Sequence, residues 1–112
     1  MKTILYIDHS ASWRFLLQEE LSEEGFEVVT ASNLEEAVST WGRIHPDLVI
    51  FEPRQNRLRE EQFERLRNKY PNILWIGYST SLQCPEEFKK WVHFYLPKSL
   101  QTEEMKSLIK SL

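Results

Sequence analysis

Side chains that can carry chemistry stand directly after apolar runs of strand length, at positions far apart in the chain. They comprise two carboxylates, an imidazole, two hydroxyls and an ammonium: Asp8, His9, Glu52, Ser79, Thr80 and Lys98. If the runs are parallel strands, their carboxyl ends meet at one edge of a sheet and bring these groups together. Such a set could bind a metal ion or pair a nucleophile with a base.

Neither of these two chemistries has its usual sequence pattern. Asp8, His9 and Glu52 carry the ligand types of a Zn²⁺ or Mn²⁺ site, but no spacing typical of zinc ligands is present. Ser79, His9 and Asp8 have the residue types of a catalytic triad, but the chain has no G-x-S-x-G turn. With only three glycines and no phosphate-binding loop, a nucleotide or flavin cofactor is not expected. A metal-binding flavodoxin-like domain stays an alternative.

The elements that must position these groups alternate along the chain. The runs predicted to be strands are 4–7, 26–31, 48–51, 73–78 and 94–96. Segments of helical period follow each of them, with residues suited to begin a helix at Ser10 or Ser12, Ser32 with Glu35, Pro85 and Thr102. Continuous apolar strands between amphipathic helices predict a doubly wound α/β fold, in which five helices cover both faces of a five-stranded parallel sheet. We expect one domain, residues 1–112.

Composition narrows the class of protein. The 112 residues are 41% hydrophobic and 28% charged, which is typical of a folded soluble domain. A net charge of -3 argues against binding to nucleic acid or anionic lipid. Cys84 is a single cysteine, and no signal peptide or membrane-spanning run is apparent. We therefore expect a cytoplasmic location with no membrane contact.

Taken in order, these segments resemble the receiver domain of bacterial two-component response regulators over essentially the full length. "ILYIDHS" resembles the strand that ends in an acidic pair, and "PDLVIFEP" the strand that ends in the phosphoacceptor aspartate. "PNILWIGYST" is similar to the strand that ends in a switch hydroxyl, and "YLPKS" to the segment with the conserved-type lysine. The resemblance implies a flavodoxin-like sheet of strand order 2-1-3-4-5 and a role in signal transduction through a phosphorelay.

The resemblance also implies a site in which an aspartate accepts a phosphoryl group from a histidine kinase. Carboxylates and a backbone carbonyl would hold Mg²⁺, while a hydroxyl and a lysine would bind the phosphoryl oxygens and stabilise the spreading negative charge. Asp8, Ser79 and Lys98 match that pattern, with Thr80 beside the switch hydroxyl.

Two positions depart from the pattern. Glu52 replaces the phosphoacceptor aspartate, and its extra methylene moves the carboxylate by about 1.5 Å, enough to impair an alignment-dependent transfer. His9 replaces the second acid, although Mg²⁺ prefers oxygen ligands. Lys98, together with His9 or Arg54, could balance Asp8 and Glu52 without a metal. We therefore expect no cofactor and weak or absent Mg²⁺ binding.

Two interpretations of Glu52 stay open. Its carboxylate could imitate part of a phosphorylated state, or it could only form a structural ion pair with Lys98. The runner-up hypothesis keeps phosphorylation, in a receiver with an unusual metal geometry.

The segment "FKKWVHFYLPKS" suggests how such a domain would act. In the family, the face formed by the fourth helix, fifth strand and fifth helix contacts protein partners, and Tyr95 falls at the aromatic switch position. Trp91 and Phe94 add bulk there and suggest a protein interface, while inward packing of Phe88, Trp91 and Val92 against a short fourth helix is the alternative. A homodimer through this face is a second arrangement. Arg57, Arg59, Arg65 and Arg67 alternate with acids, so a solvated charged face is expected for that helix.

The sequence thus predicts an atypical receiver, a pseudo-receiver that is not an enzyme and acts by protein–protein interaction.

Overall fold

A central parallel sheet organises the chain, seen in a computed structural model that describes residues 2–54 and 60–112. Its strands are β1 (Thr3–Ile7), β2 (Glu27–Ala31), β3 (Leu48–Phe51), β4 (Leu74–Ser79) and β5 (Phe94–Pro97). All neighbouring strands are parallel, and their spatial order is β2-β1-β3-β4-β5. This confirms the predicted fold class and strand order.

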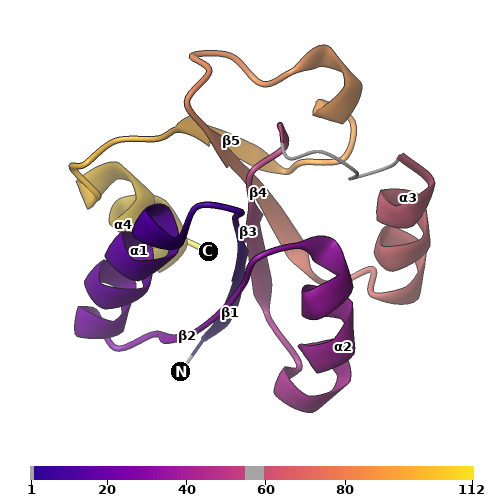
Figure 1. The fold of residues 1–112 in the computed structure, drawn as a ribbon, viewed down its shortest axis with the longest axis horizontal. Helices are drawn as coiled ribbons and strands as arrows, with labels where there is room; N and C mark the ends of the chain where they lie inside the picture. The colour runs from indigo at the N-terminus through magenta and orange to yellow at the C-terminus, as the bar shows by residue number, and fades with distance from the viewer. Residues whose placement is uncertain (1, 55–59) are drawn as a thin grey trace.

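Helices cover both faces of the sheet, as parallel strands require. The α-helices of the described ranges are α1 (Ala11–Glu23), α2 (Leu34–Ile44), α3 (Glu60–Lys69) and α4 (Glu103–Lys110). Figure 1 shows α1 and α4 together on one side of the sheet and α2 and α3 on the other. None of these helices is long and apolar enough to cross a membrane.

The strands divide their side chains between two cores, because successive residues point to opposite faces. On the side of α1 and α4, Ile4, Tyr6 and Ile50 pack with Leu17 and Ile109. The other core is more aromatic. It contains Phe51, Phe63, Trp75, Trp41 and Phe88, whose rings meet at centroid distances of 4.9 to 6.2 Å.

Local signals set most of the helix ends. Ser10 caps α1 by accepting a hydrogen bond from the Trp13 N–H at 3.3 Å, and Gly25 follows the helix with a φ of 90° that favours glycine. The cap of α2 lies one residue later than predicted. Asn33 accepts from the Glu36 N–H at 2.8 Å, and Glu36 in turn accepts from Ser32.

The predicted fourth helix is wrong. Only a short 3-10 helix, η1 (Glu86–Phe88), forms between β4 and β5. Phe88 is buried, so the apolar signal was real. The helix does not continue because strand pairing begins close behind it: His93 N–H donates to the Trp75 carbonyl at 2.8 Å, and His93 Nδ1 accepts from Trp75 N–H at 3.0 Å.

The two edge strands, β2 and β5, are held by different side-chain contacts. Gln18 on α1 donates from Nε2 to the carbonyl of Val28 on β2 at 3.0 Å. On β5, the ring of Tyr95 lies against Gly77 of β4, where a Cβ would come within 2.9 Å of Tyr95 Cδ1. The hydroxyl of Tyr95 donates to the Ser81 carbonyl. Glycine is therefore needed at position 77 to admit this ring.

We expect Gly77→Ala to lower the free energy of unfolding by about 1–3 kcal/mol, because the new methyl group would displace the Tyr95 ring. Urea unfolding measures the change. Gly42→Ala on α2 is the matched control: nothing lies within 4 Å of its Cβ, and a gain of roughly 0.5–1 kcal/mol is expected. Unchanged stability in Gly77→Ala would show that Tyr95 does not need this space.

The free energy of unfolding should also vary with pH, because His93 titrates. Partial burial, with the nearby charge of Arg67 as a second cause, lowers the pKa of His93 below its usual value. As the pH falls, His93 is therefore protonated at a higher pH in the unfolded chain than in the folded chain. The contribution of His93 is complete above about pH 6.5 and is lost as the pH falls from there through the folded-state pKa.

Because His93 is an exposed residue and solvent screens the effect, we expect this loss to stay below about 1 kcal/mol, the worth of the hydrogen bond to Trp75 N–H. His93→Asn is the control, since Asn Oδ1 can accept the same hydrogen bond and does not titrate. The difference in unfolding free energy between the two proteins should vary with pH. A constant difference between about pH 5 and 8 would contradict the assignment.

Candidate functional site

Four polar residues from four strands meet at the carboxyl edge of the sheet. Asp8 follows β1, Glu52 follows β3, Ser79 ends β4 and Lys98 follows β5. Asp8, Glu52 and Ser79 are buried, at 1%, 7% and 0% exposure. The order β1-β3-β4-β5 places the two carboxylates on adjacent strands, with the lysine arriving from the sheet edge.

The centre of the site is the ammonium of Lys98. Its Nζ lies 2.6 Å from Asp8 Oδ2 and 2.9 Å from Glu52 Oε2. The side chain of Lys98 is only 5% exposed, and its Nζ lies 5.1 Å from the ring centre of Trp13. The backbone N–H of Lys98 donates to the Ser79 carbonyl at 2.6 Å, which fixes where the side chain starts. The lysine thus joins both carboxylates in a site largely closed to water.

Neutral donors satisfy the carboxylate oxygens that remain. Asp8 Oδ1 accepts from the Ser10 N–H at 2.9 Å, and Asp8 Oδ2 also accepts from the Tyr6 hydroxyl. Glu52 Oε1 accepts from the Arg54 N–H at 3.0 Å. Burial, reinforced by the Asp8 carboxylate, raises the pKa of Tyr6, so its hydroxyl keeps the proton that it donates. Among the described residues of this cluster, these neutral donors stabilise the two carboxylates in addition to the ammonium.

The other predicted site residues lie further out. His9, Arg54 and Thr80 are exposed residues. The guanidinium of Arg54 forms no ion pair within the described ranges. Ser79 Oγ is buried, and no hydrogen-bond partner for it occurs among the described residues. Glu52 therefore contacts Lys98 rather than Ser79, and the second cation predicted from His9 or Arg54 is not seen in the ion pair.

Two participants were not identified from the sequence. Tyr6 lies two residues before Asp8 on the same face of β1, so strand alternation was an available signal. Arg14 bonds through its guanidinium to the carbonyl oxygens of Asp8 and His9, at 2.6 and 3.0 Å. Nothing in the residue pattern singles out that arginine, because it binds backbone and not side chains.

The carboxylate oxygens that a Mg²⁺ ion would need are already bonded in this arrangement. Magnesium needs near-octahedral oxygen ligands at about 2.0–2.1 Å, whereas the ammonium of Lys98 lies within hydrogen-bond distance of both carboxylates. Arg14 occupies the carbonyls of the β1–α1 loop, and His9 offers an imidazole instead of an oxygen. Within residues 2–54 and 60–112, no group of three or more His, Cys, Asp or Glu side chains could hold a metal ion.

The predicted interface residues divide between core and surface. Trp91 is half-buried and packs against the aromatic core, with its ring 5.0 Å from Lys90 Nζ. Phe94 is 37% exposed, and Tyr95 is half-buried. Arg67 donates to the Trp91 carbonyl and so joins α3 to this segment. Arg57 and Arg59 lie outside the described residues.

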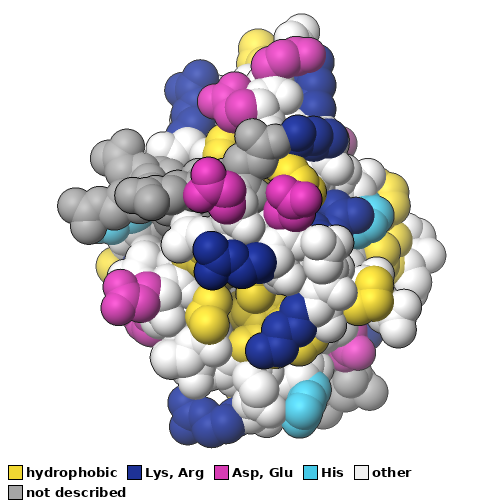
Figure 2. Space-filling model, turned by 90° about the vertical axis from the view of Figure 1, so that its right-hand side faces the viewer, with side chains coloured by type: hydrophobic (Ala, Val, Ile, Leu, Met, Phe, Trp, Pro, Cys, Tyr) yellow, Lys and Arg dark blue, Asp and Glu magenta, His cyan; other side chains and the backbone are white. Residues whose placement is uncertain are grey.

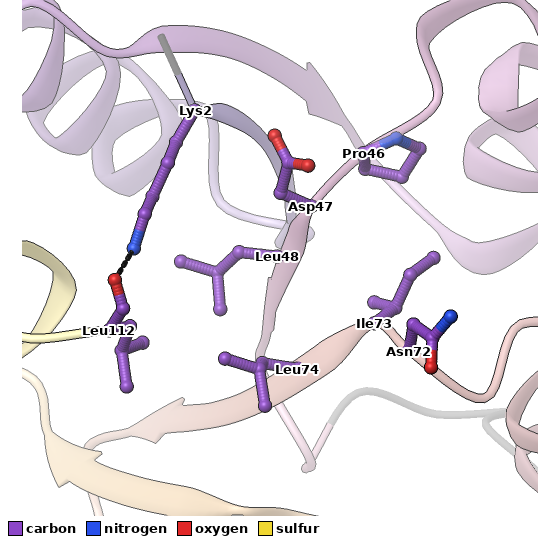
Figure 3. Close-up of a pocket in the computed structure, with 8 residues that line it drawn as sticks. All are labelled: Lys2, Pro46, Asp47, Leu48, Asn72, Ile73, Leu74 and Leu112. Atoms are coloured by element: carbon purple, nitrogen blue, oxygen red, sulfur yellow. Dashed lines mark hydrogen bonds between the residues drawn. The ribbon is translucent and has the colours of Figure 1, made fainter.

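A hollow at the opposite edge of the sheet is not part of this site. It has a volume of about 520 Å³ and is lined by Lys2, Pro46, Asp47, Leu48, Asn72, Ile73, Leu74 and Leu112 (Figure 3). Its two charged side chains already have partners: Asp47 accepts from the Thr3 N–H at 2.8 Å, and Lys2 donates to the carbonyls of Ile109 and Leu112. They hold chain segments together at the amino ends of the strands.

We expect Lys98→Met to lower the free energy of unfolding by about 3–5 kcal/mol, because it leaves two buried carboxylates facing each other without a cation. Urea unfolding at neutral pH measures this loss. Adding Glu52→Gln to Lys98→Met should restore part of the stability by removing one of the two charges. A Lys98→Met chain as stable as the wild type would contradict a structural role for the ion pair.

No family model matches the chain. A probable transcriptional regulator ycf27 of Cyanophora paradoxa is 40% identical over 114 residues, covering 99% of this chain and 48% of that protein. The ycf27 of Porphyridium aerugineum is 30% identical, covering 97% and 47%. The chain therefore spans about half the length of these curated relatives.

Solved structures match over nearly their whole length. The response regulator TrrA of Thermotoga maritima, solved in complex with Mg²⁺–BeF, is 31% identical with a TM-score of 0.85, covering 99% of this chain and 98% of that one. TrrA has also been solved in complex with the histidine kinase ThkA. The chemotaxis protein CheY4 of Vibrio cholerae is 25% identical with a TM-score of 0.83, covering 100% and 99%. By fold, sequence identity and coverage, this chain belongs to the family of response regulator receiver domains of two-component signalling.

Proposed function

We propose that this receiver domain is a pseudo-receiver, which signals by binding another protein and does not take a phosphoryl group at Glu52. One observation supports the proposal: Lys98 Nζ lies within 2.9 Å of both Asp8 and Glu52, so the carboxylates that the family pattern would offer to a metal are already bonded to the lysine. The domain would then have no catalytic role, and Mg²⁺ binding would be weak or absent.

The chemistry of the two substituted positions supports this proposal. The longer side chain of Glu52 is held at both oxygens, by Lys98 and by the Arg54 N–H, so it is not free to align with an incoming phosphoryl donor. His9 offers no oxygen for magnesium. The structural ion pair is therefore the function that we assign to Glu52 in preference to mimicry of phosphoaspartate.

The surface around β5 is where we propose that the partner binds. Exposed apolar side chains lie along this part of the chain: Leu82, Phe94 and Leu100 are 85%, 37% and 78% exposed. Tyr95 stands among them with its hydroxyl bonded to the Ser81 carbonyl. The short helix predicted here is present only as the 3-10 helix η1, which leaves Leu82 and Phe94 exposed on either side of it. A protein partner, or a second copy of the chain, would cover these residues on binding. We propose that this binding takes place in the cytoplasm.

The decisive measurement uses the fluorescence of Trp13, whose ring centre lies 5.1 Å from Lys98 Nζ. Titration of the wild type with MgCl₂ and beryllium fluoride should produce no saturable, metal-dependent change. Incubation with acetyl phosphate should leave the intact mass unchanged. Saturable quenching, or a mass increase of one phosphoryl group, would disprove the proposal.

The control variant is His9→Asp combined with Glu52→Asp, which restores the three carboxylates of the family pattern. It should gain metal-dependent quenching and become phosphorylated, because oxygen ligands and a shorter acceptor are then present. If wild type and variant respond alike, the two substitutions are not what separates this chain from phosphorylated receivers.

A further inference from the structure

A second candidate binding surface lies between α2 and α3, away from the strand-end site. A groove of about 450 Å³ runs there, lined by Leu34, Glu35, Val38, Gln62, Arg65, Leu66 and Lys69. Figure 2 views the molecule from the side on which α3 lies in Figure 1, and shows hydrophobic side chains below its centre with Lys and Arg side chains beside them. Its lining combines three apolar residues with two cations, one carboxylate and one amide.

The lining is partly apolar because α2 carries more hydrophobic surface than the sheet buries. Leu34 and Trp41 pack inward at 7% and 1% exposure. Val38, one turn after Leu34, is 49% exposed and lines the groove together with Leu66 of α3. Of the apolar residues that line the groove, Leu34 and Leu66 are buried and Val38 is the one that a bound molecule would cover.

The lining also carries cations that lack anionic partners. Arg65 and Lys69 are one turn apart on α3, and neither forms an ion pair with any residue in 2–54 or 60–112. Elsewhere, Lys106 and Lys110 pair with acids of α1. Glu35 lines the groove near the start of α2. Because α2 and α3 run in the same direction, Glu35 lies toward one end of the groove and Lys69 toward the other.

We propose that this groove binds an amphipathic helix of a partner protein, with two apolar residues one turn apart and carboxylates along the side that faces Arg65 and Lys69. A helix suits a channel between two parallel helices, because its apolar stripe can enter while its polar side stays in water. A narrow helix seated at the Arg65 and Lys69 end of the groove is favoured over a membrane, because a broad anionic surface would also meet the exposed carboxylates of Glu61 and Glu64 on α3. This inference is independent of the pseudo-receiver proposal.

The test uses two labelled helical peptides of about 16 residues, long enough to populate a helix in water. Both carry two leucines one turn apart. One has flanking glutamates, and the other has lysines at the same positions. Fluorescence anisotropy at low salt should show that the wild-type chain binds the acidic peptide about tenfold more tightly than the basic one. The preference should decrease as NaCl screens the charges of the groove.

Variants place this binding on the groove. Arg65→Glu with Lys69→Glu should reverse the preference between the two peptides, and Val38→Ser should weaken binding of the acidic peptide without changing which peptide is preferred. Lys89→Glu with Lys90→Glu changes the net charge by the same amount at another surface and should leave the preference intact. Circular dichroism checks that each variant is folded.

Three results would overturn the proposal. The wild type could fail to bind the acidic peptide at about 1 mM, which is the affinity expected for only a few contacts. The control at Lys89 and Lys90 could reverse the preference as the groove variant does, so that net charge alone explains binding. Sedimentation could show a wild-type dimer that Arg65→Glu with Lys69→Glu dissociates, which would make a second copy the occupant of the groove.

Discussion

One buried ammonium between two buried carboxylates organises the functional end of this receiver. Lys98 reaches Asp8 and Glu52 at 2.6 and 2.9 Å, and so joins the loops that follow β1, β3 and β5. The desolvation of three charges is costly, and their mutual attraction offsets that cost only with good geometry and additional hydrogen bonds. The N–H groups of Ser10 and Arg54 and the hydroxyl of Tyr6 supply those bonds. The ion pair therefore specifies one arrangement of the loops more than it adds stability.

The same interaction underlies our proposal for position 52, where the side chain is one methylene longer than aspartate. With aspartate there, the carboxylate would end closer to the backbone of β3. With glutamate, one oxygen meets Lys98 while the other turns back to the Arg54 N–H. The chain thus keeps the frame of a receiver, with TM-scores of 0.83 and 0.85 to CheY4 and TrrA, while its acceptor carboxylate is already bonded. Fold and phosphoryl chemistry are separable, since the first depends on the two cores and the second on a few strand-end atoms.

Prediction from sequence succeeded where the signal is periodic and failed where it depends on backbone contacts. Apolar runs separated by helical stripes are enough to predict a parallel sheet covered on both faces, and residues that follow such strands must meet at one edge. The helix expected after Pro85 was wrong because His93 bonds to Trp75 through both its main chain and its imidazole. The helix cap at Asn33 and the Arg14 contacts were missed for a related reason. Several residue types can make such bonds, so composition does not reveal which one does.

The contact between Gln18 and the carbonyl of Val28 has a consequence for how the chain behaves at high concentration. An open edge strand offers unpaired peptide groups on which another polypeptide can add as a further strand. On β2, the amide of Gln18 covers one of those acceptors. At the far side, β5 ends at Pro97, whose nitrogen carries no hydrogen to offer an incoming strand. Each border of the sheet thus has one outward peptide group that cannot pair with an incoming strand, which disfavours edge-to-edge association at that point.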